Sequence, residues 1–286
     1  MRDFSSDTTA LGLNTATLGH NVDNHGAGWS PERVVDACVE HGFGAIVFWT
    51  RELGKNARQI GQYARAAGLA TPALCRSPFL VGPLTPGDRS VTVDAFKKSI
   101  EICSALEADS LTVCVGGVVD EASDMRSSLN TVQQILSDAA DFASQCNVKL
   151  ALEPMHPVYA GNRSCLVTVR DSIDMIYELD NPVFGLAVDV YHVWWDLKLA
   201  SELQRLNGDQ ILSFHLCDWL ADTQDVLLDR GMMGDGVANL KEIRSAVEDA
   251  GYNGYCEVEI FSANHWWQRP PDEVLSECVS RFKTVC

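Results

Sequence analysis

Four side chains that can bind a cation stand near the ends of apolar, strand-like runs of the sequence. They are Glu153 in KLALEP, Asp189 in VFGLAVD, His215 in ILSFH and Glu259 in CEVEI. The spacings of 36, 26 and 44 residues each leave room for about one strand and one helix. Three carboxylates and an imidazole brought to one point would repel one another or take up protons unless a cation stood among them. The pattern therefore predicts a divalent-metal site.

The residue types also indicate which ion would bind and what it would do. An oxygen-rich ligand set with one imidazole favours Mn²⁺, Mg²⁺ or Co²⁺ over a structural zinc site, which prefers Cys and His. Such an ion would bind adjacent hydroxyl and carbonyl oxygens of a polyol, and it would acidify a neighbouring C–H by stabilising the enediolate that forms. Two carboxylates on opposite sides of the substrate can then act as general base and general acid.

Each ligand candidate also has an ordinary interpretation. Glu153 could form a salt bridge to Lys149, and a histidine inside an apolar strand, as His215 is, can be a hydrogen-bonded core residue. The last strand offers two acids, Glu257 and Glu259, which alternate onto the same face. Glu259 lies nearer the carboxyl end and is the better ligand, so Glu257 is expected behind the ligands or inside the barrel.

Three further residues follow these strands at short range. His192, three residues after Asp189 in DVYHVWWD, could hydrogen-bond a substrate oxygen or simply open a helix. His156, in EPMHP, lies on the loop after the fifth strand and is a candidate substrate contact. Asp218, in HLCDW, could fix the tautomer of His215 or cap the following segment.

Aromatic and basic residues gather in the segments that follow strands. Six of the seven tryptophans are placed there: Trp49, Trp194, Trp195, Trp219, Trp266 and Trp267. Sugar C–H faces stack on aromatic rings, so we expect Trp49 and Trp267 to contact substrate, although packing of a lid is the alternative. Arg51 and Arg163 could bind hydroxyls or an anionic group. The run RGMMGDG (230–236) is a shaped loop that lacks the Lys and Ser/Thr of a phosphate-binding loop.

The elements that must position these residues alternate between strand-like and helical runs. A helix begins at Ser30-Pro31-Glu32 and stops at Gly42. The strand-like runs are 10–14, 44–49, 69–75, 110–115, 148–153, 183–189, 211–216 and 254–260, and the other helical runs are 53–67, 92–107, 124–146, 168–179, 196–206, 238–250 and 272–285. Eight of each predict an α/β fold, a single (β/α)8 TIM barrel over residues 1–286. A doubly wound sheet is the competitor, but NTATLGHN after the first strand lacks G-x-G-x-x-G.

Composition narrows the partners. With 22 basic and 39 acidic residues the net charge is −17, which would repel nucleic acid and anionic membranes. No apolar run is long enough to span a bilayer, and MRDFSSDTTA has no apolar signal region. The ten cysteines form no CxxC pair and are expected to be buried, reduced thiols. We therefore expect a cytoplasmic protein.

The motifs LALEP, AVDVYH, SFH and VEIF resemble the xylose isomerase-like barrel superfamily, in the sugar phosphate isomerase/epimerase group. That group includes ketose 3-epimerases, inosose isomerases and dehydratases, and the more distant endonuclease IV. The resemblance implies metal ligands at the ends of strands 5 to 8, namely Glu153, Asp189, His215 and Glu259. It implies that Glu153 and Glu259 double as the acid–base pair and that His192, in the Asp-x-x-His pattern, orients a substrate oxygen. It also implies a possible homo-oligomer, because barrels of this group often pair.

Two details refine the resemblance. The stretch EIFSANHWW is similar to the end of strand 8 in inosose isomerases. Ketose 3-epimerases carry an Arg a few residues after the strand 7 His, and HLCDWLAD has none. Endonuclease IV uses more histidines and binds DNA, which the seven histidines and the acidic charge of this chain disfavour.

The sequence therefore predicts a metal-dependent isomerase or epimerase acting on a sugar or cyclitol. A lyase that expels a leaving group from a keto-sugar or inosose shares the first proton abstraction and stays open. A non-catalytic sugar-binding barrel subunit is the alternative of another class.

Overall fold

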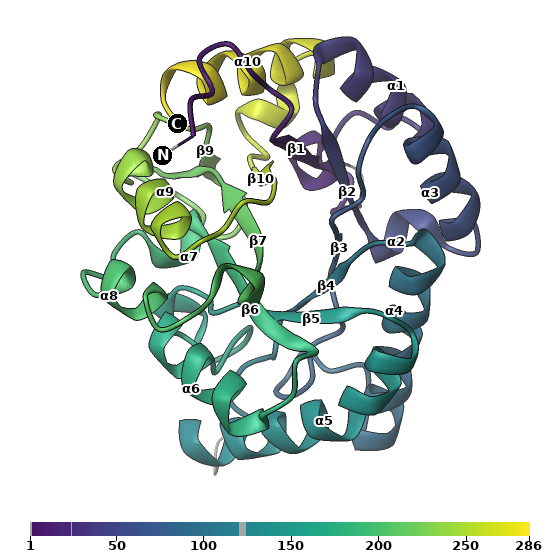
Figure 1. The fold of residues 1–286 in the computed structure, drawn as a ribbon, viewed down its shortest axis with the longest axis vertical. Coiled ribbons are helices and arrows are strands. Elements are labelled where there is room, and N and C mark those ends of the chain that lie inside the picture. The colour runs from purple at the N-terminus through teal and green to yellow at the C-terminus, as the bar shows by residue number, and fades with distance from the viewer. Residues whose placement is uncertain (1, 24, 120–123) are drawn as a thin grey trace.

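The computed structural model describes residues 2–23, 25–119 and 124–286, and parallel strands form a closed barrel at its centre (Figure 1). The order around the barrel is β1-β10-β7-β6-β5-β4-β3-β2. The strands are β1 Leu11–Asn14, β2 Ala45–Trp49, β3 Ala73–Cys75, β4 Ser110–Val113, β5 Lys149–Leu152, β6 Phe184–Asp189, β7 Ile211–Leu216 and β10 Cys256–Val258. Each lies inside a predicted strand-like run, so the expected barrel fold is confirmed.

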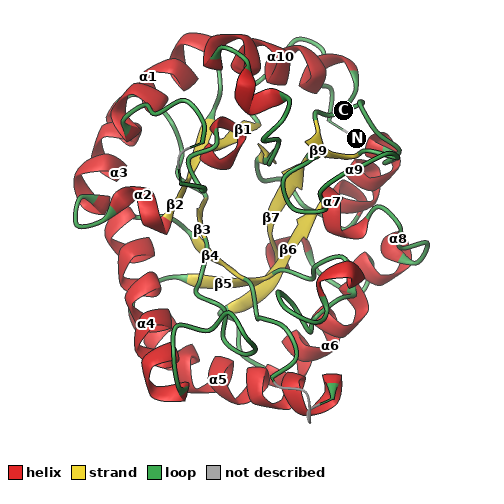
Figure 2. Ribbon diagram, turned by 180° about the vertical axis from the view of Figure 1, so that it is seen from behind, coloured by secondary structure: helices red, strands yellow, loops and turns green. Residues whose placement is uncertain are grey.

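Helices surround the strands as an outer ring (Figure 2). They are α1 Pro31–His41, α2 Thr50–Leu53, α3 Ala57–Ala66, α4 Arg89–Leu106, α5 Met125–Gln145, α6 Val169–Leu179, α7 Val190–Val193, α8 Leu199–Leu203, α9 Leu240–Asp249 and α10 Pro271–Thr284. α1 has the expected signals: Ser30 Oγ accepts a hydrogen bond from the Arg33 N–H, and Gly42 ends the helix with a φ of 79°. Within the described residues, no helix is both long and apolar enough to cross a membrane.

Two of the expected helical runs are divided or shortened in the structure. The run 53–67 is interrupted at Gly54, which has a φ of 50°, so α2 ends before it and α3 begins at Ala57. The run 196–206 is helical only over α8, because Asp196 accepts a hydrogen bond from the Lys198 N–H (2.9 Å) and holds the preceding residues in a turn.

The barrel strands are buried on both faces, as expected where helices cover a parallel sheet. β1, β4 and β6 are buried at every position. All ten cysteines are free, and only Cys146 is not fully buried, which confirms the expected thiols. Since each large apolar side chain contributes roughly 1.5–3 kcal/mol when buried, the barrel wall is a stiff frame for the residues at its rim.

The loop after β7 contains a ribbon that the sequence did not indicate. β8 (Asp218–Trp219) pairs antiparallel with β9 (Arg230–Gly231). Two-residue strands have no periodicity to detect. The ribbon folds the chain back toward the barrel mouth and thereby delivers Arg230 to it.

Candidate metal centre and its cavity

The structure brings the four predicted ligands together at the rim. Glu153 directly follows β5, Asp189 ends β6, His215 is the fifth residue of β7, and Glu259 directly follows β10. One ligand atom from each lies within 4.8 Å of the others, and all four residues are buried. The register explains the meeting, since His215 pairs across the sheet with Asp189 on one side and with Glu257 on the other.

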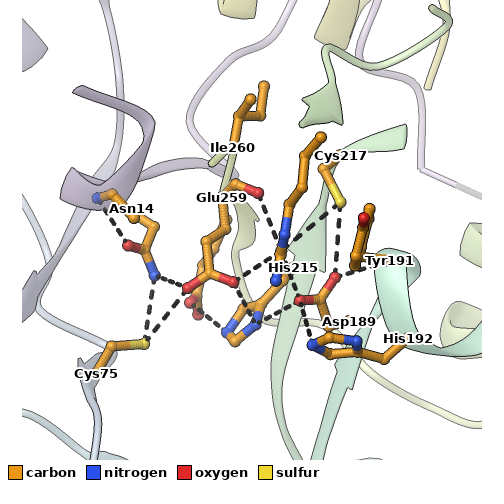
Figure 3. Close-up of polar contacts among 12 residues, drawn as sticks. Asn14, Cys75, Asp189, Tyr191, His192, His215, Cys217, Glu259 and Ile260 are labelled. Atoms are coloured by element: carbon orange, nitrogen blue, oxygen red, sulfur yellow. Dashed lines mark hydrogen bonds and ion pairs between the residues drawn. The ribbon is translucent and has the colours of Figure 1, made fainter. Parts of the chain in front are cut away.

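The ring of His215 lies between the carboxylates of Glu259 and Asp189 (Figure 3). Its Nδ1 is 3.1 Å from Glu153 Oε1, 3.8 Å from Glu259 Oε2 and 3.9 Å from Asp189 Oδ2. Its Nε2 is 3.2 Å from Glu257 Oε2. Burial opposes a charge on this ring, but Glu259, Glu153 and Glu257 raise the pKa of His215 well above its ordinary value. A cation bound at Nδ1 would replace the proton there, and Glu257 beside Nε2 would then favour the tautomer that carries its proton on Nε2.

Each ligand carboxylate has one oxygen toward the centre and its other oxygen held by neutral donors. Glu259 Oε1 accepts from Asn14 Nδ2 (2.9 Å), and Asp189 Oδ1 accepts from the Tyr191 N–H (2.8 Å). Three buried thiols reach the same outer oxygens: Cys114 Sγ at 3.4 Å from Glu153, Cys217 Sγ at 3.7 Å from Asp189 and Cys75 Sγ at 3.9 Å from Glu259. Burial raises the pKa of each thiol well above its ordinary value, so all three remain uncharged S–H donors.

The buried charges of the cluster do not balance. If all four carboxylates are ionised, counting Glu257, they face only the guanidinium of Arg230 and at most one imidazolium on His215, and two negative charges would be left uncompensated. Burial raises the pKa of Glu259 to about 7 in spite of His215 and Arg230. Burial opposes ionisation of Asp189 too, but Arg230, the two neighbouring histidines and the Tyr191 N–H together outweigh it, and the pKa of Asp189 falls to about 2.

These residues fit a divalent cation. His215 Nδ1 is fully buried and makes no hydrogen bond of acceptable geometry within the described chain, and three carboxylate oxygens surround it. A doubly charged ion would supply the missing positive charge and a partner for that nitrogen.

His192 stands beside this cluster. Its Nε2 is 3.7 Å from Asp189 Oδ2, and its ring lines the adjoining cavity. Burial lowers the pKa of His192 to about 4, so the ring is neutral near pH 7.

Arg230 is a central residue that was not expected from the sequence. Its Nη1 donates to Asp189 Oδ2 (2.9 Å) and Glu259 Oε2 (3.1 Å), and its guanidinium lies over the rings of Tyr191 (4.5 Å) and Phe261 (4.3 Å). The segment HLCDWLAD has no arginine. Arg230 lies fifteen residues after His215 in the sequence, and the β8–β9 ribbon brings it to the centre. The only sequence signal was a basic residue next to a glycine-rich run.

The cavity above the cluster has a volume of about 150 Å³. This volume can hold on the order of ten water-sized groups. A monosaccharide or cyclitol ring is about that size. Trp49 forms part of its wall and donates from Nε1 to Asn14 Oδ1 (2.8 Å). Arg163 lines the cavity as well, together with Arg76, Phe79, Tyr159, Leu227, Leu228 and Phe261.

Several expected contacts do not reach the cavity. His156 stacks on Trp219 with ring centres 4.6 Å apart and accepts from the Val158 N–H. Trp267 lies against Phe261 and donates to the carbonyls of Ala16 and Ile260. Neither His156 nor Trp267 is among the cavity-lining residues of the described chain, so the structure gives no direct substrate contact for them.

The contacts of the loops bear on two further expectations, and for Asp218 they agree with the second of its two expected roles, capping the segment that follows. Asp218 does not hold His215; its carboxylate accepts from the N–H groups of Gly234 (3.0 Å) and Ala238 (2.9 Å) and so shapes the loop after β7. The acid beside His215 Nε2 is Glu257 instead, at 3.2 Å. Arg51 bonds to Asp23 and to the carbonyl of Asn21, outside the cavity wall.

Comparison with known proteins places this geometry in context. A family model described as xylose isomerase-like TIM barrel matches residues 35–284. An inosose isomerase of Bacillus velezensis is 22% identical over 245 residues, which cover 81% of this chain and 84% of the relative. The crystal structure of protein SMc04130 from Sinorhizobium meliloti 1021 superposes with a TM-score of 0.89 at 38% identity, covering 97% of this chain and 98% of that one. The IolI protein, solved with a bound zinc atom, superposes with a TM-score of 0.79 at 18% identity over 96% of this chain and 97% of that one.

Proposed function

We propose that this chain, which belongs to the xylose isomerase-like TIM barrel family, is a divalent-metal-dependent isomerase or epimerase of a sugar or cyclitol. The observation that carries the proposal is the buried cluster of Glu153, Asp189, His215 and Glu259, with ligand atoms within 4.8 Å of one another. The relative named inosose isomerase supports the same class of reaction. The size of the cavity supports a substrate of one sugar or cyclitol ring.

The chain's own residues divide the work of moving a proton. A divalent ion held by the four ligands would stabilise negative charge on a substrate oxygen and so make the neighbouring C–H more acidic. β5 and β10 are separated by β6 and β7 around the barrel, so Glu153 and Glu259 approach the centre from different sides. One carboxylate takes the proton from carbon, and the other delivers a proton to the opposite face or to the neighbouring carbon.

His192 and the apolar wall prepare the substrate for that transfer. His192 Nδ1 has no hydrogen-bond partner within the described residues and belongs to a ring that lines the cavity. A neutral ring can exchange a hydrogen bond with a substrate oxygen and fix its orientation. Leu227, Leu228 and Phe261 give the cavity an apolar wall, and displacement of water from this wall by a substrate would strengthen the polar contacts made there.

The test is product analysis in D₂O. Protein loaded with Mn²⁺ is incubated with a panel of ketoses and inososes, and the products are followed by NMR. An isomer that carries deuterium at the epimerised or isomerised carbon is the expected result. Loss of water or of another substituent would identify a lyase and overturn the proposal.

A matched pair of variants separates an enzyme from a binding subunit. Glu153→Gln keeps the shape of the ligand but removes its charge, and we expect turnover to fall by at least 10²-fold with an unchanged circular dichroism spectrum. Glu101→Gln alters an exposed acid of α4 and serves as the control. Metal-loaded parent protein that turns over no member of the panel, yet binds sugars, would identify a binding module.

A further inference from the structure

Two arginines of the cavity have no carboxylate partner among the residues that the structure describes. Arg76 directly follows β3, and Arg163 lies in the loop after β5; both line the cavity that holds Glu153 and Glu259. Both guanidiniums lie over the ring of Phe79, with Cζ at 3.9 Å from the ring centre for Arg76 and at 5.9 Å for Arg163. The two positive charges therefore share one side of the same cavity.

Neither arginine forms an ion pair with any residue that the structure describes, unlike Arg230. Arg76 donates to the carbonyl of its neighbour Ser77 (2.9 Å), and that is its one side-chain hydrogen bond within the described residues. The guanidinium of Arg163 makes none there, and both side chains are partly buried. Burial lowers the pKa of Arg163, and the nearby charge of Arg76 lowers it further.

Such an arrangement is unfavourable unless something binds between the two groups. Burying a charge without a partner costs free energy, and two like charges add repulsion. In a chain with 39 acidic and 22 basic residues, acids to neutralise them are plentiful. Among the described residues, the acids near the pair stay beyond ion-pair distance: Asp225 acts on Arg163 only through its charge, and Glu153 and Glu259 of the same cavity face His215 and Arg230. An anion from outside the chain would supply the direct contact that both guanidiniums lack.

The backbone holds the two arginines together. Isolated bridges join Val81 to Gly116 and Gly116 to Ser164, and the Gly116 N–H donates to the Arg163 carbonyl (3.0 Å). Gly116 has a φ of 96°, and a Cβ there would lie 1.9 Å from the Val81 carbonyl oxygen, so only glycine fits. The loops that carry Phe79 and Arg163 are thus fastened side by side, which keeps the two arginines on the same side of the cavity.

We propose that Arg76 and Arg163 form a subsite for an anionic group, a carboxylate or a phosphate, on the same substrate whose hydroxyl and carbonyl oxygens reach the metal centre. The inference deepens the proposed function and rests on it. Guanidinium groups recognise both anions through paired N–H donors. The substrate class is therefore an acidic or phosphorylated sugar or cyclitol, and a neutral polyol lacks the group that this side of the cavity is built to receive.

The experiment measures binding and needs no turnover. Isothermal titration of the Mn²⁺-loaded protein with D-fructose, D-fructose 6-phosphate and D-glucuronate compares a neutral probe with one of each anion. We expect at least one charged probe to bind at least about tenfold more tightly than fructose, with an affinity that weakens as salt is added. The charged probe that binds distinguishes phosphate from carboxylate.

Variants assign the preference to the two arginines. The double variant Arg76→Gln/Arg163→Gln should lose the preference for the anion and keep its Mn²⁺ affinity. The control, Arg58→Gln, changes an exposed arginine of α3 and should keep both. Equal affinity of the parent for neutral and charged probes, or a preference that survives in the double variant, would overturn the inference. A parent that binds the anion but no metal would instead overturn the proposed function, so the two failures are distinguishable.

Discussion

Replacing Glu257 by Gln tests whether the centre depends on a residue that does not itself bind the metal. Glu257 Oε2 lies 3.2 Å from His215 Nε2, and both side chains are fully buried. Two unit charges at that distance interact by about 5 kcal/mol with an effective dielectric constant of 20. That figure is an upper bound, because the imidazole that binds a metal is neutral and because Gln keeps an oxygen that can accept from Nε2–H.

The smaller effect that remains acts on His215: without the Glu257 carboxylate, the Nε2–H tautomer is less favoured and Nδ1 is a less basic metal ligand. Removing such a partner of a metal-binding histidine typically costs 10–100-fold in metal affinity, or about 1.4–2.7 kcal/mol. We therefore expect Glu257→Gln to bind Mn²⁺ about 10–100-fold more weakly in competition with a chelator of known affinity. Circular dichroism checks that the variant is folded, and Glu101→Gln is the matched surface control.

Two outcomes would refute this reasoning. If Glu257→Gln binds Mn²⁺ as tightly as the parent while His215→Gln does not, then Glu257 has no part in preparing Nδ1. If both variants bind with the parent's affinity, Nδ1 is not a ligand and the four-residue centre is wrong.

The remaining predictions concern stability. Chelation should lower the melting temperature, and Mn²⁺ at 100 times its dissociation constant should restore about 2.7 kcal/mol, measured by calorimetry; an unchanged melting temperature would contradict the metal site. Arg230→Gln should lower the free energy of unfolding of the metal-free protein in urea by roughly 3–5 kcal/mol, because Asp189 and Glu259 lose their shared partner. A decrease of less than about 1 kcal/mol would show that another group neutralises these carboxylates. Burial lowers the pKa of His156, so the unfolded chain binds the extra proton and stability falls as pH drops below about 6.5. His156→Phe can still stack on Trp219, and its free energy of unfolding should fall less steeply between pH 6.5 and 5 than that of the parent. The same slope in both proteins would argue against a contribution from His156.

The rim could be predicted from the sequence because strand ends are encoded locally. A buried parallel strand is a short apolar run, and a carboxylate or imidazole at its carboxyl end must lie at one edge of the sheet. Glu153, Asp189, His215 and Glu259 each stood at such a position, and the closed barrel brings them together. Position along a strand was sufficient information.

Loop residues could not be predicted in the same way, because their direction depends on distant contacts. Arg230 reaches the centre only through a ribbon of two-residue strands. His156 and Trp267 lie four and nine residues after the ends of β5 and β10, and there His156 turns to Trp219 and Trp267 turns to the carbonyl of Ala16. Following a strand fixes the edge of the barrel on which a side chain lies and leaves its direction open.

The difference between strand ends and loops also bears on which part of the site binds the metal and which part selects the substrate. The four proposed metal ligands lie on or directly after β5, β6, β7 and β10, while Arg163 lies in the loop after β5 and Arg76 opens the loop after β3. Loop segments at the rim can change with little effect on the barrel. A change in these loops would alter which substituent is bound without moving Glu153 or His215. Exchange of both arginines for neutral residues should therefore change the choice of substrate and leave the metal centre intact, which is why metal affinity and anion affinity must be measured on the same variant.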